Sequence, residues 1–196
     1  MASSRADTVN LNLLPLALSL PPELWISILR RLNYSQLKKA SRICKKIQKY
    51  ILGKEFDAVL FRQGLPKPQL QDGDKLEVHP FLQNVDCVSK DWETMMVFVR
   101  SDGNRHTPTE YPSILNEYAT SPASSMSTLI FPTGRTKPLS KMKGARVIDI
   151  LKWAAKYWKP IDFDRRLGDH RFFEGWDDVR SRGQGQTELT CYGFGS

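Results

Sequence analysis

Cysteine is scarce in this chain of 196 residues, and a long apolar run is absent. The three cysteines, Cys44, Cys87 and Cys191, lie far apart and form no CxxC pair. That pattern argues against a disulfide scaffold and against a zinc site. The apolar run at residues 11–20 is about half the length that a bilayer span needs, and it makes a poor signal peptide. We therefore expect a protein of a reducing compartment, in the cytoplasm, the nucleus or both.

Familiar catalytic motifs are also missing. The sequence holds no GxSxG, no P-loop and no GxGxxG. Asp169, His170 and Glu174 are the candidates for a metal or acid–base cluster, but their spacing fits no standard metal motif such as HExxH. We interpret the block Gly168–Trp176 as a tightly packed turn with core-anchoring aromatics. The sequence thus predicts no catalytic residue, no bound metal and no cofactor.

What the chain does have is an uneven positive charge. The formal net charge is +8, and residues 1–66 hold 11 Lys/Arg against 4 Asp/Glu, hence +7. Residues 67–196 hold the remaining 18 Lys/Arg and 17 Asp/Glu, hence +1. Charge confined to one third of a chain suggests that this third meets an acidic partner, either nucleic acid or protein.

The basic third has the periodicity of short amphipathic helices. Residues 20–32 place apolar side chains at helical spacing, with Ser19 as a possible N-cap and prolines in the first turn. A second helix is expected from Gln36 to Leu52, with Ser35 as its N-cap. Its polar face is strongly basic, and it holds Lys38, Lys39, Arg42, Lys45, Lys46 and Lys49. A third short helix is expected near residues 55–63, before a Gly-Pro breaker.

The remaining residues predict a mixture of strands and helix. Strands are expected at residues 93–100, 127–132 and 186–194, with a short one at 139–143 and a loop over 101–113. Val147–Trp158 has a clear apolar face and predicts a helix that Pro160 ends. The fold class is therefore α+β. We divide the chain into a disordered tail at 1–18, a three-helix module at 19–63 and an α+β domain at 64–196.

The first third resembles the F-box family. The resemblance rests on Leu20-Pro21-Pro22-Glu23-Leu24, on Ile28-Leu29 and Leu32, and on Leu37, Ala40 and Ile43-Cys44-Lys45-Lys46. Ile47 departs from the family pattern, because a tryptophan is usual there, and Asn33-Tyr34-Ser35 replaces the commoner acidic turn. The resemblance implies that a small acidic adaptor, which links F-box proteins to a cullin scaffold and its RING subunit, binds this module. The residues expected to contact it are Leu20, Pro21, Glu23, Leu24, Ile28, Leu32, Leu37, Ile43, Cys44 and Lys45.

The rest of the chain looks like the tail of many fungal F-box-like proteins. This likeness is carried by five stretches: His79-Pro80-Phe81-Leu82, Ala119-Thr120-Ser121-Pro122, Val147-x-Asp149-Ile150-Leu151, Gly168–Trp176 and Gly193-Phe194-Gly195-Ser196. It implies a target-selecting or structural role and supplies no catalytic residue.

Three hypotheses follow. In the first, the chain is a non-catalytic F-box subunit that recruits substrates to a cullin–RING, SCF-type ubiquitin ligase. In the second, it is a nucleic-acid-binding protein that uses the basic face from Lys38 to Lys49. In the third, it is an enzyme built around Asp169, His170 and Glu174. The target is left open, and no membrane association is expected.

Overall fold

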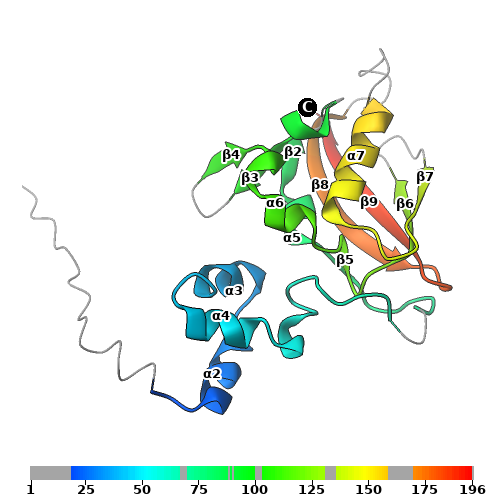
Figure 1. Ribbon diagram of the computed structural model, residues 1–196. Helices are drawn as coiled ribbons and strands as arrows, with labels where there is room; N and C mark the ends of the chain where they lie inside the picture. The colour runs from blue at the N-terminus through cyan, green and yellow to red at the C-terminus, as the bar shows by residue number, and fades with distance from the viewer. Residues whose placement is uncertain are drawn as a thin grey trace, which may run out of the picture. The chain divides into compact units, whose positions relative to one another are not determined.

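The structure, a computed structural model, describes residues 19–66, 70–87, 89, 91–99, 103–130, 136–158 and 170–195. The chain forms two compact units, residues 1–56 and residues 57–196 (Figure 1). The described elements of the first unit are helical, and the described strands all lie in the second unit. The predicted α+β class is therefore confirmed. The tail predicted at 1–18 lies outside the described residues. In the described part, no helix is long and apolar enough to cross a membrane.

Three short α-helices and a 3-10 turn lie in the described residues of the first unit. They are α2 (Pro22–Leu29), α3 (Tyr34–Ala40), α4 (Lys45–Ile51) and η1 (Lys54–Phe56). Their inward-facing residues form a small apolar core of Leu29, Leu37, Ala40, Ile47, Ile51 and Phe56. Packing holds these helices, because isolated helices below about 12–15 residues are marginal in water.

The ends of the first two helices differ from the predicted caps. Helix α2 begins one residue after Pro21, whose carbonyl accepts the Leu24 N–H at 3.1 Å, and Ser19 is not its cap. Helix α3 is capped by Asn33, whose side chain accepts the Gln36 N–H at 3.0 Å, while the Gln36 side chain accepts the Asn33 N–H at 2.9 Å. This reciprocal capping box makes Asn33 the N-cap, so the prediction of Ser35 was wrong.

The single helix predicted from residue 36 to residue 52 is also wrong, since the chain breaks between α3 and α4. The Arg42 and Ile43 N–H groups bond carbonyls three residues back, and the Ser41 hydroxyl donates to the Lys38 carbonyl at 2.8 Å. Cys44 is then fully extended (φ −160°, ψ 162°). These bonds satisfy the end of α3 and let α4 turn back, so that Leu37 and Ile47 share one core.

The predicted third helix near residues 55–63 is reduced to η1 and a series of turns. Phe61 has a positive φ of 53°, which a continuing right-handed helix does not allow. The backbone thus leaves helical geometry in this stretch.

The described strands of the second unit form three small sheets, two antiparallel and one mixed. The first pairs β1 (Glu77–Val78) with β5 (Thr120–Ser121). The second has the order β2 (Val85–Cys87), β3 (Met96–Val99), β4 (Asn104–His106). The third has the order β7 (Thr136–Ser140), β6 (Met126–Ile130), β9 (Gln186–Gly195), β8 (His170–Ser181), in which only β6 and β9 are parallel.

Short helices connect these strands, and one long helix covers the third sheet. The short ones are α5 (Pro80–Gln83), η2 (Trp92–Thr94), η3 (Pro108–Glu110) and α6 (Pro112–Leu115). Helix α7 (Val147–Trp158) has the predicted bounds and lies across one face of the sheet (Figure 1). Its buried residues Ile150 and Leu151 share a core with Leu129 of β6 and Leu189 of β9.

Several predictions for this unit need correction. The segment interpreted as a tight turn, Gly168–Trp176, contains the first half of strand β8 from His170 on. The strand bulges at Gly175 (φ 84°), where a Cβ atom would lie 2.6 Å from the Gln83 carbonyl oxygen. The loop predicted over residues 101–113 contains β4 and η3. Of the strand predicted at residues 93–100, Met96–Val99 form β3, whereas the first residues belong to the 3-10 helix η2.

A buried polar pair links two parts of the second unit. His79 is fully buried, and its Nδ1 accepts the Phe81 N–H at 3.0 Å at the start of α5. Nε2 therefore carries the proton, and it donates to the Glu117 carboxylate at 3.0 Å. Each side chain thus compensates the burial of the other.

We predict that His79→Ala destabilises the second unit by about 3 kcal/mol, because it removes a hydrogen-bond donor from the buried Glu117 carboxylate and removes the cap of α5. Urea unfolding, followed by tryptophan fluorescence, measures this loss. Arg180→Ala, which breaks the exposed pair with Asp178, is the control and changes stability by less than about 1 kcal/mol. Equal effects of the two substitutions would contradict this role of His79.

Candidate protein-binding surface of the helical unit

Helix α2 presents an apolar surface outward. Leu24 and Ile28 lie one helical turn apart, and 51% and 45% of their side chains are exposed. Leu29, one position further, is buried in the core. Because residues four apart are neighbours on a helix surface, Leu24 and Ile28 form one continuous patch. We call this pair the α2 patch.

The other predicted contact residues divide by exposure. Pro21, Glu23, Ile43 and Lys45 are exposed, and Leu20, Leu32 and Cys44 are half-buried. Leu37 is completely buried. Its predicted role as a contact residue therefore needs correction, because a side chain with no accessible surface holds the core of the unit and touches no partner.

The break between α3 and α4 explains the exposure of Ile43. Within one continuous helix this residue would lie on the core-facing stripe with Leu37 and Ala40. In the observed turn it points outward, with 66% of its side chain exposed. Leu52, just after α4, is exposed to 65% and was missed by sequence reasoning. Its position directly after the core residue Ile51 was the available signal, since adjacent helical residues point about 100° apart.

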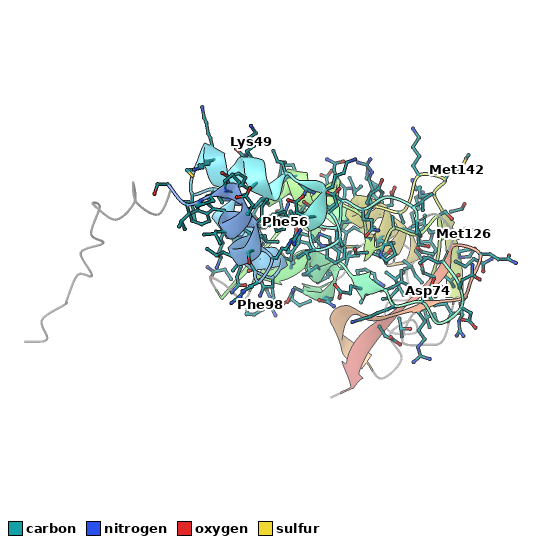
Figure 2. The ribbon with its side chains drawn as sticks, turned by 90° about the horizontal axis from the view of Figure 1, so that it is seen from below. Lys49, Phe56, Asp74, Phe98, Met126 and Met142 are labelled. Atoms are coloured by element: carbon teal, nitrogen blue, oxygen red, sulfur yellow. The ribbon has the colours of Figure 1, made fainter. Side chains whose placement is uncertain are left out.

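A basic face adjoins these apolar residues in the sequence. Lys39, Arg42, Lys45, Lys46 and Lys49 are all exposed, and Figure 2 shows Lys49 reaching outward from α4. No acidic residue occurs from residue 33 to residue 54 to neutralise them. Lys38 is half-buried and lies over the Tyr34 ring, 5.4 Å from its centroid. The face is suited to attract an acidic partner from a distance.

The other candidate cluster receives no support from the geometry. Asp169 lies outside the described residues, and so do the side chains of His170 and Glu174. Among the side chains that the structure does describe, no three His, Cys, Asp or Glu residues gather as metal ligands. The enzyme hypothesis stays an untested prediction.

Comparison with known proteins identifies the helical unit. A family model described as the F-box domain matches residues 17–58. No curated protein and no solved structure matches the chain. The match covers α2, α3, α4 and η1, and it includes every residue of the α2 patch.

We predict that the α2 patch can be changed without loss of the fold. Leu24→Glu with Ile28→Glu keeps the helical circular dichroism signal and lowers the melting temperature of the unit only slightly, because these side chains are already half in water. Leu37→Glu, in contrast, unfolds the unit, since it buries an unpaired carboxylate. Unfolding by the α2 substitutions would show that Leu24 and Ile28 belong to the core.

Proposed function

We propose that this chain, whose residues 17–58 form an F-box domain, recruits substrates to an SCF-type ubiquitin ligase. F-box domains bind the adaptor subunit of such ligases, and F-box proteins are typically non-catalytic substrate receptors. The observation that carries the proposal is the α2 patch, an apolar surface inside the matched domain that the described residues leave open.

The energetics favour a protein partner for this patch. Complete burial of a leucine or isoleucine side chain contributes about 1.5–3 kcal/mol, and about half of each side chain is still available. Covering Leu24 and Ile28 thus contributes roughly 1.5–3 kcal/mol to binding. Ile43 adds a third anchor if the same partner reaches it. A few buried anchors of this kind dominate many interfaces.

The basic face favours an acidic adaptor. Exposed lysines and arginines speed the encounter with a negatively charged protein more than they strengthen the final complex. In this proposal the α2 patch supplies affinity and the basic face supplies the association rate.

The second unit then presents the target. Holding a target beside the ligase raises the local concentration of its lysines near the activated ubiquitin, and the chain itself performs no chemical step. The expected places of action are the cytoplasm and the nucleus.

The alternative partner is nucleic acid, and the exposed cluster of cations in α3 and α4 is the observation that favours it. Binding that depends on phosphate contacts weakens steeply as salt rises. Binding that depends on the α2 patch is much less sensitive to salt, so the two can be separated.

The test measures the affinity of the full chain for the purified SCF adaptor. We expect Leu24→Glu with Ile28→Glu to weaken binding about a hundredfold, which corresponds to about 2.7 kcal/mol. Isothermal titration calorimetry at about 0.15 M salt gives the dissociation constants.

The control is Met142→Glu, which places one carboxylate on a side chain of the second unit that is 90% exposed (Figure 2). It should leave adaptor binding unchanged. The proposal fails if the unaltered chain does not bind the adaptor, or if the double substitution has no effect. Salt-sensitive binding of a 20-base-pair DNA duplex without adaptor binding would favour the alternative.

A further inference from the structure

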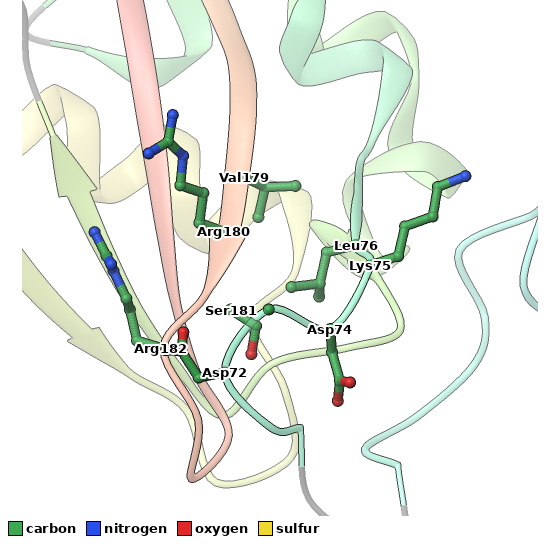
Figure 3. A pocket seen from close by; sticks show the side chains of 9 residues that line it. Asp72, Asp74, Lys75, Leu76, Val179, Arg180, Ser181 and Arg182 are labelled. Carbon is green, nitrogen blue, oxygen red and sulfur yellow. The ribbon is translucent and has the colours of Figure 1, made fainter.

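The second unit contains a cavity of about 370 Å³ beside the end of β8, between residues 72–76 and residues 179–182 (Figure 3). Its Leu76 wall is buried in the unit. The bridge between Asp72 and Arg182 and the hydrogen bond from the Ser181 hydroxyl to the Gln71 carbonyl tie its two sides together. The cavity is therefore part of the unit's own packing, and we assign no ligand to it.

Helix α4 of the first unit has an outward face that combines cations with an apolar side chain. The buried residues Ile47 and Ile51 lie one turn apart and mark the side of the helix that faces the core. Successive helical residues point about 100° apart, so Lys45, Lys49 and Leu52 lie on the opposite side. Leu52 is the C-cap and keeps helical dihedral angles (φ −75°, ψ −6°), so the same rotation applies to it.

The side chains of this face are accessible. Lys45 and Lys49 are exposed, as is Lys46 beside them, and Figure 2 shows Lys49 reaching outward. The exposed fraction of Leu52 is 65%. We call Lys45, Lys46, Lys49 and Leu52 the α4 outer face.

The charge around this face calls for an anionic partner. Residues 33–56 hold seven Lys/Arg and one carboxylate, Glu55, hence +6. One carboxylate does not balance seven cations on a unit of this size, so the face attracts surfaces that carry many negative charges.

Leu52 distinguishes between the anionic surfaces that could cover the lysines. The phosphates of a nucleic acid satisfy the lysines but leave Leu52 in water. A bilayer with anionic lipids offers negative headgroups and, directly beneath them, an apolar layer that a leucine can enter. The leucine within the stripe of lysines therefore favours the bilayer.

We propose that the α4 outer face binds the surface of an anionic membrane, with its lysines at the lipid headgroups and Leu52 inserted beneath them. A lysine held near such a surface tightens binding about fivefold, so the three lysines together contribute about a hundredfold. The expectation of no membrane association rested on the short apolar run at residues 11–20 and did not consider exposed helix faces.

The membrane contact does not depend on adaptor binding, because Leu52 and the α2 patch lie on different helices. If the chain serves an SCF-type ligase, this contact would hold the complex at a negatively charged membrane surface. A chain that binds the adaptor but no vesicles would overturn only the membrane contact. A chain that binds vesicles but no adaptor would overturn only the proposed function.

The experiment measures cosedimentation of the full chain with vesicles of phosphatidylcholine that contain about 30% phosphatidylserine, at about 0.15 M salt. We expect binding at least about tenfold tighter than to vesicles of phosphatidylcholine alone. Lys46→Gln with Lys49→Gln should weaken binding about thirtyfold, since two cations are lost. Leu52→Ala should weaken it about fivefold, because most of the inserted apolar side chain is removed.

Each substitution has a matched control in the second unit. Lys75→Gln with Lys143→Gln removes the same charge from two exposed lysines, and Met142→Ala shortens an apolar side chain that is 90% exposed. Both should change vesicle binding less than about twofold, since screening limits the reach of distant charges. Circular dichroism checks that every variant keeps its helices.

Equal binding to the two kinds of vesicle, or binding to neither, would overturn the proposal. Vesicle binding that survives the lysine and Leu52 substitutions would also overturn it, because another part of the chain would then make the contact. Binding of a 20-base-pair DNA duplex without vesicle binding, and unchanged by Leu52→Ala, would show that the face contacts phosphates of nucleic acid instead.

Discussion

The scarcity of core in the helical unit is the constraint on which the account depends. Its described α-helices, α2, α3 and α4, have eight, seven and seven residues, too few for any of them to be stable in isolation. Six buried apolar side chains hold them together. Four further large apolar residues, Leu24, Ile28, Ile43 and Leu52, lie largely in water. A partner that covers some of them would add to the stability of the unit as well as bind it, since ligands that bind only the folded state stabilise it. Recruitment and folding are therefore coupled in this proposal.

The general organisation could be predicted from the sequence, because apolar periodicity follows burial. The spacing of Val147–Trp158 predicted helix α7 with its observed bounds, and the alternating stretch at residues 186–194 predicted β9. The joint spacing of Leu-Pro-Pro-Glu and Ile-Cys-Lys predicted the F-box, which the family model confirms over residues 17–58. The exposed pair Leu24 and Ile28 was among the predicted contact residues.

The predictions that were wrong depend on contacts that the spacing of apolar residues does not reveal. The stripe from Leu37 to Ile51 is continuous in sequence, and only the bonds of residues 41–44 turn α4 back and expose Ile43. Asn33, and not Ser35, is the N-cap of α3, because the Asn33 and Gln36 side chains each accept a backbone N–H of the other residue. The first half of β8 resembles a turn in sequence because it contains Gly175. In the structure this glycine lies at a β-bulge, where the backbone of α5 approaches closely, and α5 is far away in sequence.

The two units have complementary designs. In its described residues the first has a small core, an exposed apolar patch on α2 and a basic face, which together suit a protein partner. The second has a larger core of its own, which includes Ile150 and Trp176. The most direct test of the central claim is the heat-capacity change when the SCF adaptor binds the full chain, obtained from calorimetric titrations at several temperatures. Burial of the α2 patch predicts a clearly negative change together with a higher melting temperature of the helical unit. A change near zero, or binding that raises the melting temperature of the second unit alone, would contradict the account.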